Sequence, residues 1–298
     1  MSIEARPAMQ KDFLRIFQKG FNYSQDGPGN RLVYHLQGCN LRCAWCANPE
    51  GMSWEPPLLV TGKLEGAYCP HGAIADGQLD RTVCETCAAR ECLHTHRNSS
   101  MKCAAVDVPL EEIIREAVSC RPMFFDGGGV TFTGGEPTLQ WSALWELLPR
   151  LKANGIAVAL ETNGTHPRLP ELLDCIDTLM MDCKQADSAL HEQHTGLPNA
   201  MVLQNIRAAV SAGKHPQIRI PLIHGVNDTK QDAERFLEFF QSLKGEFTVE
   251  VLPYHEYGKE KWGQCGRLYA VENGFVRTED VRRLQTLLAD HAIAVIHT

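Results

Sequence analysis

From Leu110 onward the chain alternates short apolar runs with stretches whose apolar residues recur at helical spacing, and this alternation limits the fold more than any other feature. The expected strands cover residues 130–132, 156–160, 178–181, 218–223, 247–252 and 293–296. The expected helices cover residues 110–118, 139–153, 170–175, 201–212, 232–243 and 278–291. Apolar strands separated by amphipathic helices form a parallel sheet that is buried on both faces. About six or seven such units predict an α/β fold, a partial (β/α)6-type TIM barrel rather than a full barrel of eight units.

An earlier buried strand is expected at residues 31–37, and it ends at a loop with three cysteines. Cys39, Cys43 and Cys46 follow the spacing C-x3-C-x2-C. Thiolates hold iron–sulfur clusters, and a trio this close can bind three of the four irons of a [4Fe-4S] cubane. The fourth iron then has no protein ligand and can bind a cofactor directly. The alternative is a zinc site, but zinc takes four ligands and the loop offers no fourth one nearby.

Polar residues come directly after several of the expected strands. Glu136, Glu161, Asp182 and His255 share this position with Cys39. Because the loops after parallel strands converge on one face of a barrel, these side chains are expected to form one site. The string Gly134-Gly135-Glu136-Pro137 fits such a site, since glycines let a ligand approach the backbone and a carboxylate can pair with an ammonium group.

Residues 52–108 break the alternation and divide the chain into three segments, namely 1–51 with the cysteine loop, the insertion 52–108, and 109–298. The insertion contains too little apolar sequence for a core of its own, so a metal is expected to organise it. Its Cys69-Pro70 pair resembles the end of one half of a bacterial ferredoxin motif, and Cys84, Cys87 and Cys92 resemble the start of the next half. In two-cluster ferredoxins the cysteine before proline ligates the cluster of the other half. The resemblance therefore implies a ferredoxin-like insertion with a second [4Fe-4S] cluster on Cys69, Cys84, Cys87 and Cys92.

The insertion departs from the ferredoxin pattern and leaves two alternatives open. The gap from Cys87 to Cys92 is longer than usual, and Cys103, which lacks a following proline, could replace Cys92 as a ligand. Zinc is the alternative to iron–sulfur, because a C-x2-C pair suits it as well. Three histidines could then be ligands, although solvated histidines are the simpler reading: His71, His94 and His96.

Composition narrows the setting in which such a chain works. The formal net charge of −7 disfavours general binding to nucleic-acid backbones. No apolar run is long enough to span a membrane, and residues 1–17 lack the apolar core of a signal peptide. The expected location is therefore the cytoplasm, where 12 cysteines argue for metal ligation and against disulfides.

Taken together, these motifs resemble those of the radical S-adenosylmethionine (radical SAM) superfamily. The turn Asp26-Gly27-Pro28-Gly29, the cysteine loop with its Asn48-Pro49-Glu50 flank, and the Gly-Gly-Glu-Pro string occur in the expected order. Asp182-Cys183-Lys184 resembles a D-x-K motif, and residues 252–259 followed by Lys261-Trp262 resemble a late L-P-Y-H-E-x-G-K segment. These last two segments are similar to the glycyl-radical-enzyme activating branch, of the pyruvate formate-lyase activating enzyme type.

The resemblance implies a ligand set. S-adenosylmethionine would bind the open iron of the cluster on Cys39, Cys43 and Cys46, and no catalytic side chain is assigned beyond the ligands. The residues implied to contact S-adenosylmethionine are Trp45, Ala47, Gly134, Gly135, Glu136, Asp182, Cys183, Lys184 and His255. The resemblance also suggests a monovalent cation near Glu161 and Asp182, although Glu161 replaces the aspartate of the family pattern.

The implied activity is the activation of a partner protein. An electron from a flavodoxin- or ferredoxin-type donor would enter the cluster and cleave S-adenosylmethionine, and the 5′-deoxyadenosyl radical would take a hydrogen atom from a glycine Cα of a glycyl radical enzyme. Two alternatives stay open. One is a radical SAM enzyme acting on a small molecule, similar to 7-carboxy-7-deazaguanine synthase, and the other is a ferredoxin-like electron carrier.

Overall fold

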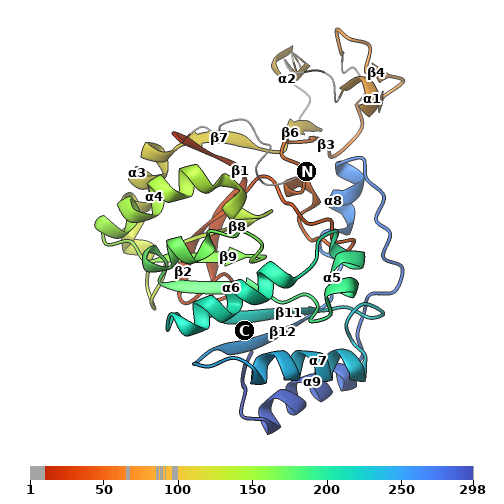
Figure 1. Cartoon of the computed structure of the whole chain (residues 1–298). Helices are drawn as coiled ribbons and strands as arrows, with labels where there is room; N and C mark the ends of the chain where they lie inside the picture. Colours follow the sequence, from red (N-terminus) through yellow and green to blue (C-terminus); the bar gives the residue numbers. More distant parts are fainter. Residues whose placement is uncertain are drawn as a thin grey trace.

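The computed structural model describes residues 11–64, 68–84, 87, 90, 92–95 and 100–297, and within this part the chain is built on a nine-stranded sheet (Figure 1). In spatial order the strands are β13 (Ala294–Ile296), β12 (Thr248–Pro253), β11 (Gln217–Leu222), β10 (Thr178–Asp182), β9 (Val158–Thr162), β8 (Gly129–Gly134), β2 (Asn30–Leu36), β1 (Phe13–Tyr23) and β7 (Val106–Pro109). The strands from β13 to β2 pair in parallel, whereas β1 and β7 are antiparallel. The α/β partial barrel predicted from the sequence is thus confirmed.

Helices cover the outer face of this sheet, as Figure 1 shows. They are α3 (Leu110–Ser119), α4 (Trp141–Ala153), α6 (Ala200–Ser211), α7 (Lys230–Gln241) and α9 (Thr278–Asp290). Short 3₁₀ segments are η2 (Pro49–Gly51), η3 (Arg121–Met123), η4 (Pro137–Gln140) and η5 (Leu169–Cys175). Leu144, Ile206 and Phe236 of the helices are fully buried and share one apolar core with Phe132 and Ile218 of the strands. Because both faces of the sheet are buried, its strands could be predicted from apolar runs in the sequence.

Two strands of the main sheet, and two helices outside the insertion, were not expected from the sequence. The strands β1 and β7 form the antiparallel edge, and β1 buries few side chains beyond Leu14 and Ile16, so its apolar pattern is weak. Helix α5 (Ser188–Thr195) buries only His191 and Thr195, and α8 (Lys259–Gln264) buries only Trp262. Helices with so little apolar surface leave no periodic signal in the sequence.

The insertion forms a small body that projects from the sheet at the top of Figure 1. Its elements are β3 (Leu58–Val60) paired with β6 (Met101–Cys103), β4 (Ile74–Ala75) paired with β5 (Gln78–Leu79), and the short helices α1 (Arg81–Cys84) and α2 (Cys92–Thr95). Its core contains Leu58, Leu64, Cys92 and Met101. The main sheet resumes at β7, which begins at Val106, two residues before the expected boundary at residue 108. The ferredoxin-like character of the insertion stays a prediction.

Some expectations fall on residues that the structure does not describe. Residues 1–10, which make up much of the stretch read for a signal peptide, lie outside the described part, as do His96 and the side chain of His94. Within the described residues, no helix combines the length and apolar character needed to cross a membrane.

A buried arginine closes the barrel interior at the end where the parallel strands begin. The Arg31 side chain is almost fully buried and donates to the Thr131 Oγ1 over 2.7 Å and to the Val130 carbonyl over 2.8 Å. Further bonds reach the carbonyls of Gly127 and Pro28. Burial lowers the pKa of Arg31 to about 10. All of these partners are neutral oxygens. The hydrogen bonds connect the turn before β2 to strand β8.

Candidate active site

The cysteine loop leaves β2 at Leu36 and is folded by its own backbone. The N–H of Gly38 donates to the Gly51 carbonyl over 2.9 Å, and the N–H of Cys39 donates to the Met52 carbonyl over 3.2 Å. These bonds bring the two ends of the loop together, with η2 as the returning turn. The three thiols are therefore held by a closed loop on the rim of the barrel.

The three thiols sit in surroundings that favour metal ligation. The N–H of Leu41 donates to the Cys39 sulfur and the N–H of Asn48 donates to the Cys46 sulfur, each over 3.4 Å. Burial raises the pKa of all three thiols, that of Cys43 to about 12. Buried thiols of this kind become thiolates when a metal supplies the opposing charge. In the described part of the chain no three His, Cys, Asp or Glu side chains converge as a single-ion site would require. The donor set fits a cluster with one iron per thiol.

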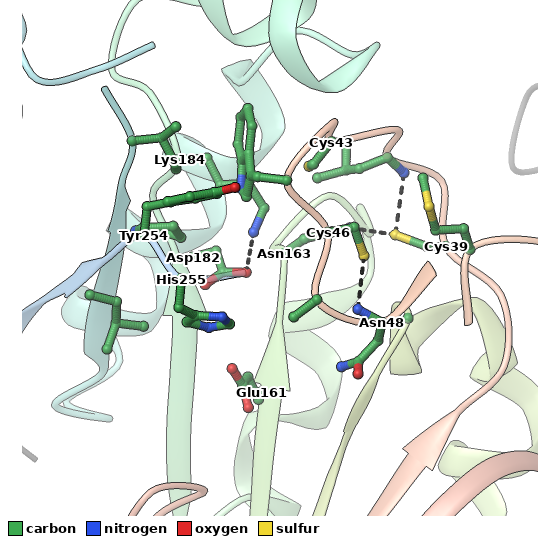
Figure 2. A pocket seen from close by; sticks show the side chains of 18 of the residues that line it. Cys39, Cys43, Cys46, Asn48, Glu161, Asn163, Asp182, Lys184, Tyr254 and His255 are labelled. Atoms are coloured by element: carbon green, nitrogen blue, oxygen red, sulfur yellow. Dashed lines mark hydrogen bonds and ion pairs between the residues drawn. The ribbon is translucent and has the colours of Figure 1, made fainter. Parts of the chain in front are cut away.

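The loop and the ends of the parallel strands enclose one cavity (Figure 2). Asp182 ends β10 and Lys184 follows it, Glu161 and Asn163 lie at the end of β9, and His255 follows β12. The predicted residues that line the cavity are Cys39, Cys43, Trp45, Cys46, Ala47, Gly134, Gly135, Glu161, Asp182, Lys184 and His255. Four of the five polar residues expected to share a site after different strands, namely Cys39, Glu161, Asp182 and His255, line this cavity.

Lys184 and Asp182 form the main ion pair of the cavity. The Lys184 Nζ lies 2.6 Å from the Asp182 Oδ2, and both side chains are mostly buried, with exposed fractions of 13% and 18%. Burial alone would lower the pKa of Lys184, but the Asp182 carboxylate and the neighbouring thiols of Cys43 and Cys39 raise it above its ordinary value. Lys184 is therefore a cation held beside the cysteine loop.

Glycine is required at both positions of the Gly134-Gly135 pair. Gly134 has a φ of +120°, and a Cβ there would lie 2.4 Å from the Leu36 nitrogen. A Cβ on Gly135 would lie 2.2 Å from the Gly38 carbonyl oxygen, inside the cysteine loop. The pair thus lets β8 pack directly against the loop and exposes its backbone to the cavity.

Glu136 has a different set of partners from the one expected. Its side chain is fully buried and does not line the cavity. One oxygen accepts from the Thr138 N–H and from the hydroxyls of Thr138 and Thr162, and the other accepts from the Asn163 N–H over 2.7 Å. Burial raises the pKa of Glu136, and these bonds oppose that shift. The expectation that Glu136 pairs with an ammonium group is corrected, since its carboxylate joins the ends of β8 and β9.

The expectation that Cys183 contacts S-adenosylmethionine is also corrected for its side chain. Its side chain is buried in the main apolar core, and burial raises the pKa of its thiol to about 12. Successive residues of an extended chain point to opposite sides, so Asp182 and Lys184 face the cavity while Cys183 faces the helices.

Part of the cavity wall was not expected from the sequence. These residues are Leu41, Asn48, Met52, Asn163, Pro221, Ile223, Leu252, Pro253 and Tyr254. The position of Pro221 and Leu252 at the ends of β11 and β12 was the available signal, because every strand end on this face points toward the site.

The insertion cysteines divide into a group and an outlier. Burial raises the pKa of Cys84, and the nearby thiols of Cys92 and Cys69 add to this effect, as Cys69 and Cys87 do for Cys92. The sulfur of Cys103 instead accepts from the Arg90 guanidinium over 3.1 Å. Whether Cys92 or Cys103 completes the set stays a prediction.

Comparison with known proteins places this site in a family. A family model described as the radical SAM superfamily matches residues 33–240. The 4-hydroxyphenylacetate decarboxylase activating enzyme of Clostridioides difficile (strain CD196) is 29% identical over 288 residues, covering 90% of this chain and 91% of its own. The indoleacetate decarboxylase activating enzyme of Tractidigestivibacter scatoligenes is 33% identical over 275 residues, covering 84% of this chain and 86% of its own.

A solved structure shares the fold at low identity. The radical SAM methyltransferase from Sphaerobacter thermophilus superposes with a TM-score of 0.57 at 14% identity, over 93% of this chain and 67% of that chain. That likeness concerns the fold, whereas the family match and the activating enzymes concern sequence over most of the chain. The chain belongs to the radical SAM superfamily and, within it, to the branch of activating enzymes that these relatives represent.

Proposed function

We propose that this enzyme activates a glycyl radical enzyme by removing a hydrogen atom from the Cα of a glycine in its partner. The observation that carries the proposal is one cavity in which a three-cysteine loop faces the Gly134-Gly135 backbone, the Lys184–Asp182 pair and His255. The relatives named as activating enzymes match nearly the full length of the chain, which favours a protein substrate over a small molecule.

Each part of the cavity has a role in this proposal. Cys39, Cys43 and Cys46 hold a [4Fe-4S] cluster that, together with S-adenosylmethionine, supplies a 5′-deoxyadenosyl radical after one-electron reduction. Lys184 attracts the carboxylate of S-adenosylmethionine, and its bond to Asp182 fixes the ammonium in place. The carbonyls of Gly134 and Gly135 are open to the amino group of the same ligand.

The opposite wall is assigned to the adenosine part. His255 stacks on Tyr257 with 4.3 Å between ring centroids, which fixes the imidazole at the rim. Burial lowers the pKa of His255, so the ring is neutral near pH 7 and can stack or accept a hydrogen bond. Trp45 and Ala47 bring the cysteine loop to the same ligand, and the apolar side chains of Leu252 and Pro221 exclude water.

We further propose that the insertion carries a second [4Fe-4S] cluster on Cys69, Cys84, Cys87 and Cys92. Four thiols saturate a cubane, so this cluster would serve electron transfer or docking and not bind S-adenosylmethionine. The electron is proposed to come from a flavodoxin- or ferredoxin-type donor.

The experiment is anaerobic reconstitution followed by reduction in the presence of S-adenosylmethionine, with and without a glycyl radical enzyme encoded beside this chain's gene. The expected result is 5′-deoxyadenosine together with a glycyl radical signal in the partner by electron paramagnetic resonance. 5′-Deoxyadenosine without an organic radical in any partner would favour a small-molecule substrate. The absence of 5′-deoxyadenosine would leave only the electron carrier.

A further inference from the structure

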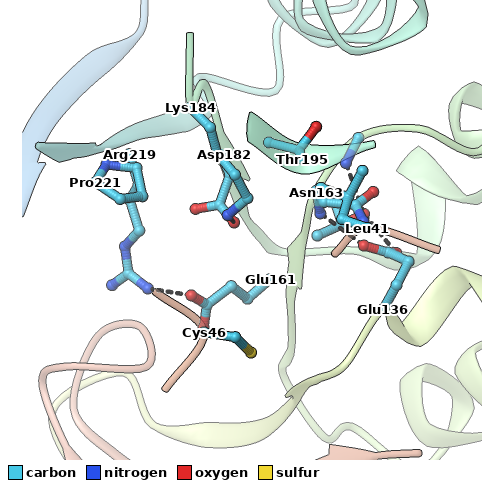
Figure 3. Close-up of polar contacts among 12 residues, drawn as sticks. Leu41, Cys46, Glu136, Glu161, Asn163, Asp182, Lys184, Thr195, Arg219 and Pro221 are labelled. Atoms are coloured by element: carbon cyan, nitrogen blue, oxygen red, sulfur yellow. Dashed lines mark hydrogen bonds and ion pairs between the residues drawn. The ribbon is translucent and has the colours of Figure 1, made fainter. Parts of the chain in front are cut away.

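A buried arginine bridges two carboxylates beneath the cavity. The Arg219 Nη1 lies 2.9 Å from the Glu161 Oε1, and its Nε lies 2.9 Å from the Glu250 Oε2 (Figure 3 shows the first pair). The side chain of Arg219 is 5% exposed and that of Glu250 is 2% exposed. A third guanidinium nitrogen donates to the Gln25 carbonyl, in the turn that precedes β2. The single guanidinium of Arg219 on β11 thus connects β9, β12 and the turn that precedes β2.

Glu161 is the member of this network that reaches the cavity. Its exposed fraction is 22%, and it lines the cavity beside Asp182 and Lys184. Its Oε1 is paired with Arg219, and its Oε2 accepts from the Thr133 hydroxyl over 2.9 Å. Both oxygens of Glu161 therefore have partners from the protein.

The monovalent cation suggested by the family resemblance does not fit this donor set. Its two expected carboxylates are Glu161 and Asp182, and each is paired with a protein cation, Arg219 in one case and Lys184 in the other. Asp182 is also the register neighbour of Arg219 across β10 and β11, so it feels the same guanidinium charge. Glutamate is one methylene longer than the aspartate of the family pattern, and here it extends to Arg219.

We propose that Arg219 is the built-in counter-ion of this cavity, so that S-adenosylmethionine binds without a monovalent cation. Arg219 acts through Glu161 and is a positioning residue, because it does not line the cavity itself. The inference rests on the proposed binding of S-adenosylmethionine. It predicts that the affinity for S-adenosylmethionine becomes dependent on K⁺ only when the Arg219–Glu161 ion pair is broken.

The test compares K⁺ with choline at equal ionic strength, using two readouts. One is the dissociation constant of S-adenosylmethionine for the anaerobically reconstituted protein, and the other is the unfolding midpoint of the cluster-free protein. The wild-type dissociation constant should agree between the two salts within about twofold, as expected for a site with no ion to load. Arg219→Gln should bind at least about tenfold more weakly in choline than in K⁺, because Glu161, the carboxylate of this network that lines the cavity, then loses its guanidinium partner.

Two further variants separate charge from structure. Arg219→Gln combined with Glu161→Gln should lose the preference for K⁺, since the carboxylate that needed the ion is gone. Arg31→Gln is the matched control, because Arg31 is an equally buried arginine whose hydrogen bonds all go to neutral oxygens and which forms no ion pair with a cavity residue. It should lower the unfolding midpoint by the same amount in both salts.

The outcomes are distinct. A wild-type enzyme that binds S-adenosylmethionine about tenfold better in K⁺ would overturn the inference, as would a folded Arg219→Gln variant that is indifferent to K⁺. If Arg219→Gln does not fold, recovery of the fold in the double variant supports the inference and failure of both contradicts it. If no variant binds S-adenosylmethionine, the proposed function fails, whereas the unfolding midpoints still report whether Arg219 is the counter-ion.

Discussion

The indole N–H of Trp262 donates to the carbonyl oxygen of Cys46 over 2.9 Å, so helix α8 holds the cysteine loop from outside. The neighbouring Lys261 reaches the same loop, with its Nζ 3.0 Å from the Asn48 Oδ1 and 2.7 Å from the Glu50 Oε1. The late motif of the sequence therefore does two things. His255 faces the cavity, and the Lys-Trp pair supports the loop that carries the cluster.

Replacing Trp262 should weaken the attachment of α8 to the cysteine loop, but the loop should still bind its cluster. Trp262→Phe keeps an aromatic ring but removes the N–H, which costs about 1 kcal/mol for one hydrogen bond. The reconstituted variant should lose its signature cluster to a chelator about fivefold faster than wild type, followed by visible absorbance. Trp145→Phe is the control, since Trp145 is an exposed tryptophan of α4 remote from the loop. Equal rates for all three proteins would show that α8 does not support the cluster.

Cys43→Ala should abolish cleavage of S-adenosylmethionine. The cubane loses one of its three thiolates, and Cys43 is buried in the loop. The measurement is 5′-deoxyadenosine after chemical reduction, with cluster content determined in parallel. Cleavage at the wild-type rate would contradict the ligand assignment.

The insertion can be tested with two matched cysteine variants. Cys87→Ala should lower the iron content by about half while the signature cluster still cleaves S-adenosylmethionine, because each cubane holds four irons. Cys103→Ala should leave the iron content unchanged, since the Cys103 sulfur accepts a hydrogen bond from the Arg90 guanidinium. Two results would rule out the second cluster. One is a wild-type protein that contains zinc and the iron of only one cubane, and the other is an equal iron content in wild type and Cys87→Ala.

His166 predicts a pH dependence of stability. The ring is stacked on Trp141 with centroids 4.4 Å apart, and burial, aided by Arg168, lowers the pKa of His166 to about 4. The unfolded chain protonates this histidine near pH 6.5, whereas the folded chain stays neutral until about pH 4. The unfolded state therefore binds more protons in this window, and stability falls as the pH drops from about 6.5 to about 4.

The size of this loss is at most about 3 kcal/mol, from a shift of roughly two and a half pKa units. His166→Phe keeps the stack and removes the proton, so denaturant unfolding of the variant should fall less steeply across the same window. Parallel pH profiles for the two proteins would show that His166 does not contribute.

Much of the fold was predictable because burial on both faces makes parallel strands apolar throughout. The same physics hid β1, whose outer face is solvated and carries Arg15 and Lys19 among its apolar residues. Helix α5 was hidden for a related reason, since it buries only His191 and Thr195 and accepts a backbone hydrogen bond from the Arg42 N–H of the cysteine loop at the Thr195 carbonyl.

The residues at the ends of the strands were predictable, because the topology of a parallel sheet alone brings them to one face. Side-chain direction was not, and for this reason Glu136 and Cys183 were expected to contact the ligand although they face away from the cavity. Arg219 left no signal, because a charged residue within an apolar strand reads as a simple interruption. Its partners come from β9, β12 and the turn before β2, and only the folded chain brings them together.

The central claim is a [4Fe-4S] cluster with one iron open to S-adenosylmethionine in the cavity of Lys184 and His255. The most direct measurement is Mössbauer spectroscopy of anaerobically reconstituted Cys87→Ala, which isolates the signature cluster. We expect a cubane in which one iron of four changes its isomer shift when S-adenosylmethionine is added. A spectrum that lacks a cubane, or one that stays unchanged at saturating S-adenosylmethionine, would contradict it.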